Sequence, residues 1–172
     1  PADAKAVLGV SDAASDVTRP SIKAPVAQSI SLASMSDEEV VVDNRDAGFT
    51  FVGQLKEAAC GVNNHTNWTY ASNETDGITN DVAAVWRPTI PQSGQYQVFA
   101  HVPSCSTPTN LTTNARYEIA HSGGKANVTI NQSTQRGWVS LGTFSLSEGS
   151  AGYARLTDLT SESYYEKRAI MI

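Results

Sequence analysis

The chain has 172 residues, of which 17% are charged, and its formal net charge is -5. This length is enough for one domain with its own hydrophobic core. Because no basic region or long apolar run is present, we expect neither nucleic acid as a partner nor insertion into a membrane.

The first 38 residues differ in composition from the rest of the chain. They are rich in Ala, Ser, Asp and Pro, contain no aromatic residue and show no sustained hydrophobic period. We interpret residues 1–38 as a linker or an irregular extended arm. Within it, residues 3–8 are compatible with a short helix and residues 29–33 with an edge strand. Since the chain begins with Pro1 and not Met, we expect it to be a piece of a longer product.

Residues 39–172 are predicted to form one all-β domain. Short strand-like runs follow one another at intervals of about 8 to 15 residues, separated by turn residues such as those at 91–94. This spacing is typical of an antiparallel β-sandwich of the jelly-roll type. The side chains expected in its core are those of Trp86, Tyr96, Val98, Ala100, Trp138, Leu141, Phe144 and Leu146.

The number of glycosylation sequons points to the secretory pathway. The chain contains six Asn-x-Ser/Thr triplets, whereas its composition gives roughly two by chance. In the segment KANVTINQ at residues 125–132, apolar and polar residues alternate, which predicts a strand with its acceptor asparagines facing solvent. We interpret that face as glycan-bearing or solvent-exposed. The six acceptors are Asn64, Asn67, Asn73, Asn110, Asn127 and Asn131.

The cysteine pattern supports the same compartment. Cys60 and Cys105 are the only cysteines, and each lies in a polar, turn-rich stretch. We expect them to form a disulfide, with two reduced surface thiols as the alternative. Together with the sequons, the pair predicts an extracellular glycoprotein that is secreted or held at the cell surface.

Five blocks of the β-rich region are VVVDNRDAGF at 40–49, AVWRPTIPQSGQYQVF at 84–99, NARYEIAHSGG at 114–124, VTINQ at 128–132 and GWVSLGTF at 137–144. In this order, they resemble the golvesin C-terminal domain, also described as the carbohydrate-binding-like domain of xanthan lyases. The resemblance covers residues 40–172. It implies a β-sandwich attached to larger extracellular proteins, with carbohydrate binding by analogy, and it brings no catalytic residues. The cysteine pair and the ending AIMI depart from the family pattern.

The sequence contains no catalytic motif with the characteristic residue spacing, and we predict that the chain is not an enzyme. It has no nucleophile elbow, no HExxH, no glycine-rich phosphate loop and no CxxC. One loop offers oxygen ligands at close spacing, from Asp43, Asn44 and Asp46, which fits a structural calcium ion. An Asx turn explains the same residues without a metal. We expect no other cofactor.

Carbohydrate binding needs exposed aromatic rings and polar groups for the sugar hydroxyls. Trp68, Tyr70, Tyr153, Tyr164 and Tyr165 lie outside the firmest core strands. The predicted ligand-binding residues are Trp68 and Tyr70 from this set and, in addition, Arg116. The loop around Trp68 also carries three sequons, so a glycan-decorated shield is the alternative for it.

Two hypotheses for the function remain. In the first, the domain is a noncatalytic carbohydrate-binding-like accessory module of a larger secreted or cell-surface protein, with a polysaccharide or glycan as its partner. In the second, it is a structural assembly module that packs against other copies or neighbouring domains through its arm and sheet edges.

Overall fold

The computed structural model describes residues 4–7, 39–77 and 82–172, the first range as backbone only. This part of the chain is built from β-strands and two short 3-10 helices, η1 at Val62–Asn64 and η2 at Tyr164–Glu166. The all-β prediction is confirmed.

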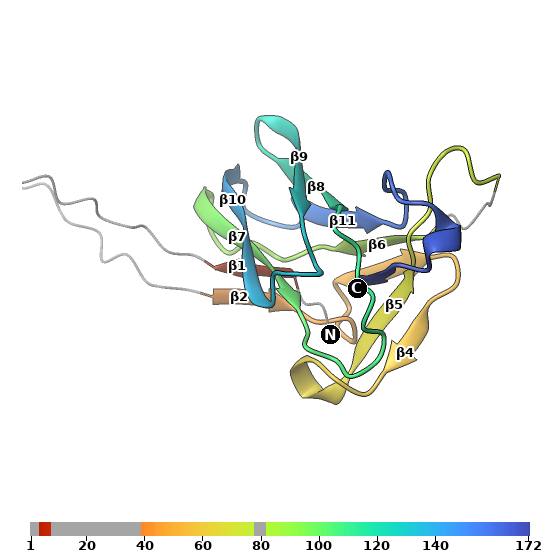
Figure 1. Ribbon diagram of the computed structural model, residues 1–172. Helices are drawn as coiled ribbons and strands as arrows, with labels where there is room; N and C mark the ends of the chain where they lie inside the picture. The colour runs from red at the N-terminus through yellow and green to blue at the C-terminus, as the bar shows by residue number, and fades with distance from the viewer. Residues whose placement is uncertain (1–3, 8–38, 78–81) are drawn as a thin grey trace, which may run out of the picture.

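The strands form three antiparallel sheets, shown in Figure 1. The four-stranded sheet has the order β10 (Gly137–Leu146), β7 (Gly94–Val102), β1 (Ala4–Val7) and β2 (Glu39–Val42). The five-stranded sheet has the order β3 (Phe49–Val52), β6 (Ala83–Trp86), β11 (Tyr153–Thr157), β8 (Ala115–His121) and β9 (Gly124–Ile130). A small third sheet has the order β12 (Ala169–Met171), β5 (Thr66–Tyr70) and β4 (Lys56–Ala58).

The core lies between the two larger sheets, which makes the fold a β-sandwich. Strand β7 shows the period-two pattern most clearly, because Tyr96, Val98 and Ala100 are all buried as predicted. From the opposite sheet Trp86 and Ile119 are each 1% exposed and pack into the same interior. Leu141 and Leu146 are also buried, and Phe144 is partly buried against the core.

The prediction that Trp138 lies in the core is wrong. Its side chain is 39% exposed, while that of the next residue, Val139, is buried. Strand alternation allows only one of two neighbouring residues to face inward, and Val139 takes that place. Trp138 is paired in register with His101, and their ring centroids are 5.0 Å apart on the outer face.

The expected helix at residues 3–8 is also wrong, because Ala4–Val7 forms strand β1. Its register runs from Ala4 opposite Val42 to Val7 opposite Glu39 on one side, and it pairs with β7 on the other. Four residues are too few to form a stable helix alone, whereas a place between two strands satisfies the backbone on both sides. The 1–38 segment therefore contributes a strand to the sheet. The edge strand expected at residues 29–33 lies outside the described residues.

The turn between β2 and β3 is tied to the rest of the molecule by one buried side chain, that of Asn44. Its Nδ2 donates to the Ile172 carbonyl at 2.7 Å and to Asn67 Oδ1 at 3.1 Å. Its Oδ1 accepts a hydrogen bond from Trp86 Nε1 at 3.0 Å. One amide thus joins the turn, β5, β6 and the last residue of the chain, and we call this set the Asn44 network.

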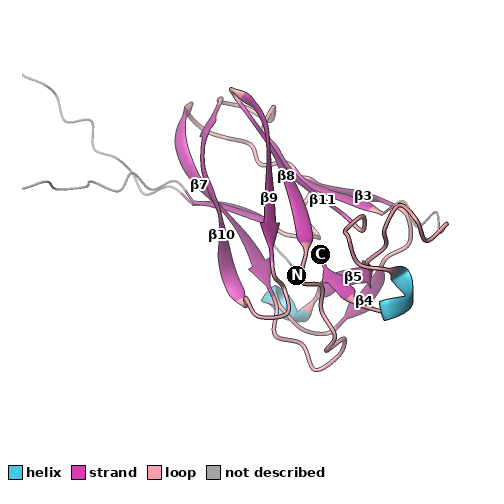
Figure 2. Ribbon diagram, turned by 45° about the horizontal axis from the view of Figure 1, so that its top comes forward, coloured by secondary structure: helices cyan, strands magenta, loops and turns pink. Residues whose placement is uncertain are grey.

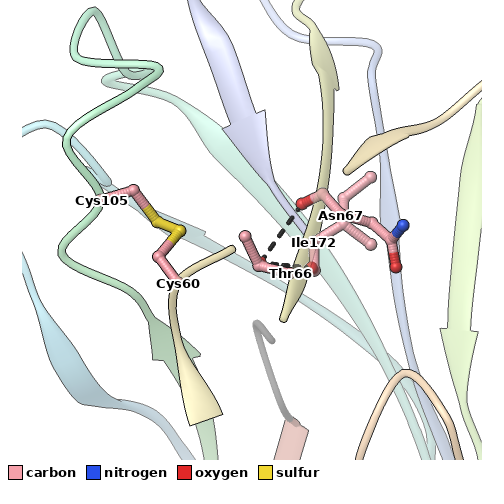
Figure 3. Close-up of a disulfide and its surroundings, with 5 residues drawn as sticks. All are labelled: Cys60, Thr66, Asn67, Cys105 and Ile172. Carbon is pink, nitrogen blue, oxygen red and sulfur yellow. Dashed lines mark hydrogen bonds between the residues drawn. A yellow bond between two sulfur atoms is a disulfide. The ribbon is translucent and has the colours of Figure 1, made fainter. Parts of the chain in front are cut away.

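The disulfide prediction is confirmed, since Cys60 and Cys105 are bonded and their Cα atoms are 5.5 Å apart. Figure 3 shows the bond beside Thr66, whose hydroxyl donates to the Ile172 carbonyl at 3.1 Å. The closed loop spans 45 residues of sequence. In the chain-entropy treatment, a loop of this length adds about 4 kcal/mol to the free energy of unfolding.

Replacement of Asn44 by Ala should lower the free energy of unfolding by about 2 to 4 kcal/mol, because the buried indole N–H of Trp86 and the buried side-chain oxygen of Asn67 lose their hydrogen bonds to Asn44. Urea unfolding followed by tryptophan fluorescence measures this loss. The matched control is Asn127→Ala, at an exposed position on β9, which should change stability by no more than about 0.5 kcal/mol. Equal effects of the two substitutions would contradict the role of the Asn44 network.

Candidate functional site

The small third sheet presents two chemically different faces. On β5, Asn67 and Thr69 are buried on the side of the core, and Trp68 and Tyr70 are half-buried on the opposite side. The register of β4 with β5 places Lys56 directly opposite Trp68. Because paired residues in an antiparallel ladder share a face, Lys56 extends along the two aromatic rings.

The aromatic side chains on this outer face pack in a row. The ring centroids of Trp68 and Tyr70 are 5.2 Å apart with an interplanar angle of 83°. Tyr70 and Tyr164 are 5.7 Å apart at 89°. Tyr165 continues the row at 6.1 Å from Tyr164 and is 71% exposed. Such edge-to-face contacts fix the orientation of the rings.

Two lysine ammonium groups lie over these rings. Lys56 Nζ is 4.6 Å from the ring centroid of Trp68 and 4.4 Å from that of Tyr70. Lys167 Nζ is 5.1 Å from the centroid of Tyr70 and 3.5 Å from that of Tyr164. We call Lys56, Trp68, Tyr70, Tyr164 and Lys167 the aromatic–lysine patch. Within the described ranges, no carboxylate forms a salt bridge with either lysine.

The segment carrying Tyr164 is anchored by Asp76. The Asp76 carboxylate accepts from the Tyr164 backbone N–H at 2.6 Å and from the Ser163 hydroxyl at 2.8 Å. Ser163 in turn caps η2 by accepting from the N–H of Tyr165 at 3.2 Å. The hydrogen bond from Tyr164 is the main cause of a lowered pKa of Asp76. Figure 2 shows η2 beside β4 and β5.

A buried carboxylate, Glu162, holds the same segment from its other side. Glu162 accepts from the Thr113 N–H at 2.9 Å and hydroxyl at 2.7 Å, and from the Thr112 hydroxyl. Arg168 Nε is 3.4 Å away. Burial alone raises the pKa of Glu162, but the threonine hydrogen bonds and the Arg168 charge outweigh burial, so the pKa is lowered.

The predicted ligand-binding residues divide between two sheets. Trp68 and Tyr70 are in contact on β5, whereas Arg116 is exposed on β8, opposite Thr129 in the five-stranded sheet. The structure therefore does not bring Arg116 to the two aromatic residues.

The outer face that carries Arg116 has a polar cluster of its own. Tyr153 donates to Glu118 Oε1 at 2.8 Å, and Lys125 Nζ is 3.0 Å from the same oxygen. The guanidinium of Arg87 lies 5.0 Å from the centroid of the Tyr153 ring. Because Glu118 neutralises Lys125, this cluster differs from the aromatic–lysine patch.

The loop expected to hold calcium forms hydrogen bonds within the protein. Asp43 Oδ1 accepts from the Arg45 N–H at 3.1 Å, Asp46 Oδ2 accepts from the Asp43 N–H at 2.7 Å, and Asn44 belongs to the Asn44 network. These contacts are those of the Asx-turn alternative. Among the described residues, no group of three or more His, Cys, Asp or Glu side chains is placed to hold a metal ion. The calcium ion stays a prediction without geometric support.

The six sequons differ in accessibility. Asn64, Asn110 and Asn127 are exposed, and Asn73 and Asn131 are half-buried in turns where their side-chain oxygens accept from Thr75 and Ser133. Asn67 is only 8% exposed, and its amide is bonded to Asn44. The folded chain has no room for a glycan there, so Asn67 is not an acceptor in this fold. On β9 the outward position of Asn127 is as predicted, whereas Asn131 lies beyond the strand.

Comparisons with known proteins found a family match and a structure with a similar fold. The golvesin C-terminal domain matches residues 40–169. The chain belongs to the golvesin C-terminal domain family. A similar solved structure is that of a Paenibacillus xanthan lyase, with 28% sequence identity and a TM-score of 0.62. The match covers 77% of this chain and 12% of the lyase. No curated protein matches the chain.

The family and this coverage identify the chain as an accessory module of a larger protein. The golvesin family is one of modules, and the matched part is a small fraction of the lyase. In the described residues no helix is long and apolar enough to cross a membrane.

Sequence reasoning missed the two lysines of the patch and its two anchoring carboxylates. Lys56 is 12 positions from Trp68, and only the register of β4 with β5 brings them together. Asp76 and Glu162 lie in polar stretches that look like ordinary loops. Tyr164 carried a usable signal, since it is an aromatic residue outside the core strands.

The lowered pKa of Glu162 predicts a dependence of stability on pH. Below the ordinary glutamate pKa of 4.5 the unfolded chain takes up a proton that the folded chain still excludes, so stability falls as the pH drops through the folded pKa. Thermal unfolding between pH 7 and pH 3 should show a smaller pH-dependent loss in Glu162→Gln than in the wild type. The control Glu148→Gln alters an exposed residue and should retain the wild-type dependence. An unchanged profile in Glu162→Gln would contradict the assignment.

Proposed function

We propose that this chain is a noncatalytic, extracellular, carbohydrate-binding-like module that holds a larger secreted or cell-surface protein on a polysaccharide. The aromatic–lysine patch is its binding face. The observation that carries this proposal is the row of half-buried rings on the outer side of the third sheet, oriented by edge-to-face packing. Sugar rings have apolar faces that pack on aromatic side chains, and their hydroxyls bond to adjacent polar groups.

Rigidity of the patch favours binding. Trp68 and Tyr70 stand on β5, whose inner residue Asn67 belongs to the Asn44 network. Tyr164 is fixed by Asp76. A site whose side chains are already ordered loses less conformational entropy when a ligand binds.

An extracellular location is supported by the Cys60–Cys105 disulfide, which is typical of oxidising compartments. We further propose that glycans are attached at the exposed acceptors Asn64, Asn110 and Asn127. A glycan on Asn127 would also shield β9, which is one of the two edge strands of the five-stranded sheet.

This glycan assignment predicts an excess mass on the chain secreted from a eukaryotic host. Glycosidase treatment followed by peptide mapping should find glycan at Asn64, Asn110 or Asn127 and none at Asn67. Asn67 serves as the internal control because its triplet is equally complete in sequence but buried in the fold. Occupancy of Asn67 in folded, disulfide-bonded protein would contradict the structure, and bare asparagines throughout would contradict the glycan proposal.

A structural assembly role is the second candidate, and strand β1 is the observation that favours it. Ala4–Val7 fills the position between β7 and β2, and residues 8–38 separate it from β2 along the chain. An equivalent strand from another copy would make the same ladder. Size-exclusion chromatography with light scattering should detect a stable dimer if this role is the main one.

The binding proposal predicts that Tyr164→Ala weakens retention on polysaccharide by about tenfold, since one well-packed aromatic contact is worth about 1 to 1.5 kcal/mol. Affinity electrophoresis on a panel of immobilised polysaccharides measures the effect. Trp138→Ala is the matched control, because it removes an aromatic ring that is 39% exposed on β10 of the four-stranded sheet, outside the patch.

Both variants must first give the wild-type circular dichroism spectrum and unfolding temperature within a few degrees. A loss of binding in Trp138→Ala equal to that in Tyr164→Ala, or no loss in Tyr164→Ala, would contradict the assignment of the patch.

A further inference from the structure

The faces of the aromatic rings in the patch are already occupied by ammonium groups. Lys56 Nζ lies over Trp68 and Tyr70, and Lys167 Nζ lies over Tyr70 and Tyr164. A neutral sugar would have to displace these ammonium groups before it could stack on the rings. An anionic group that binds an ammonium on the side away from the ring leaves the cation–π contact in place. The geometry therefore favours a ligand that carries negative charge.

Both ammonium groups lie close to the same ring, at 4.4 Å and 5.1 Å from the centroid of Tyr70. Two like charges held this close repel each other unless a counter-ion is present. The neighbouring acidic side chains are engaged elsewhere. Glu166 binds Arg168 Nε at 3.1 Å, and Asp76 accepts from Ser163 and Tyr164. Glu57, next to Lys56 in the chain, lies opposite Asn67 and therefore on the other face of the third sheet.

Lys56 and Lys167 give the patch two positive charges, whereas the formal net charge of the whole chain is -5. The two ammonium groups of the patch are therefore positive charges on a chain that is acidic as a whole. A broad polyanion such as nucleic acid would be repelled by the remaining surface. A polymer with single carboxylates spaced along it, whose sugar rings can contact the exposed ring of Tyr165, fits the patch better.

We propose that the aromatic–lysine patch recognises the carboxylate groups of an acidic, uronic-acid-containing polysaccharide, with Lys56 and Lys167 as the residues that contact those carboxylates. This inference rests on the proposed function and specifies the chemical class of its ligand. Lysine is a compact point charge, suited to one carboxylate oxygen at a time. The rings position the two charges and supply apolar contact beside them.

Polygalacturonate, alginate and hyaluronate are suitable probes, each compared with its own carboxyl-reduced form. Reduction turns each carboxylate into a neutral hydroxymethyl group and preserves the sugar chain. The wild-type protein should bind at least one of the acidic polymers, and binding should weaken by about tenfold or more on carboxyl reduction. Binding should also weaken as the salt concentration rises.

The double variant Lys56→Gln/Lys167→Gln should bind the acidic polymer no better than the wild type binds the reduced one. Lys125→Gln is the matched control, because it removes a lysine that is 59% exposed but paired with Glu118 at 3.0 Å. This control should bind as the wild type does. Unfolding temperatures of all variants establish that each one is folded.

The outcomes separate this inference from the proposed function. Equal binding to the acidic and reduced forms overturns the inference and leaves the polysaccharide-binding function standing. Binding to polyglutamate as tight as to the acidic polymers overturns the sugar specificity and favours an acidic protein segment as the partner. No binding to any of the sugar polymers overturns both the inference and the proposed function.

Discussion

The Asn44 side chain donates to the last carbonyl of the chain and to Asn67, and it accepts from the indole of Trp86. These three contacts join the β2–β3 turn to β5, to β6 and to the C-terminal residue. Every partner is buried, so loss of the amide would leave polar groups in the core without hydrogen bonds. The position of the third sheet against the sandwich therefore depends strongly on this one residue.

The binding face follows from that constraint. Strand β5 gives Asn67 to the Asn44 network on its inner side and Trp68 and Tyr70 to the aromatic–lysine patch on its outer side. Since successive residues of a strand point to opposite faces, fixing the inner side also fixes the outer one. The Cys60–Cys105 disulfide and the Glu162 hydrogen bonds hold the adjoining loops. The rings of the patch thus stand on a strand and a loop that are held from the inner side, and the two lysine ammonium groups lie over these rings.

The local parts of this structure could be predicted from the sequence, and so could the Cys60–Cys105 disulfide, because two cysteines allow a single pairing. The contacts that depend on the register of distant strands could not. The alternation of apolar residues along β7 and the strand-like run around Trp86 are local signals. The residues that they place in the core are buried as expected. The inward or outward choice for Trp138 depends on the register with β7, and strand β1 depends on two ladders far along the chain. The contact of Tyr164 with Tyr70 has no periodic signal at all. The family resemblance supplied the fold but no binding residues.

Solution NMR of the isotope-labelled module, titrated with an acidic oligosaccharide, tests the central claim most directly because it reports the site without substitutions. The binding face proposed here predicts that the largest chemical-shift changes occur at the indole N–H of Trp68 and at the backbone amides of Lys56, Tyr70, Tyr164 and Lys167. Changes concentrated on the outer face of β8 and β11, around Arg116 and Tyr153, would contradict it.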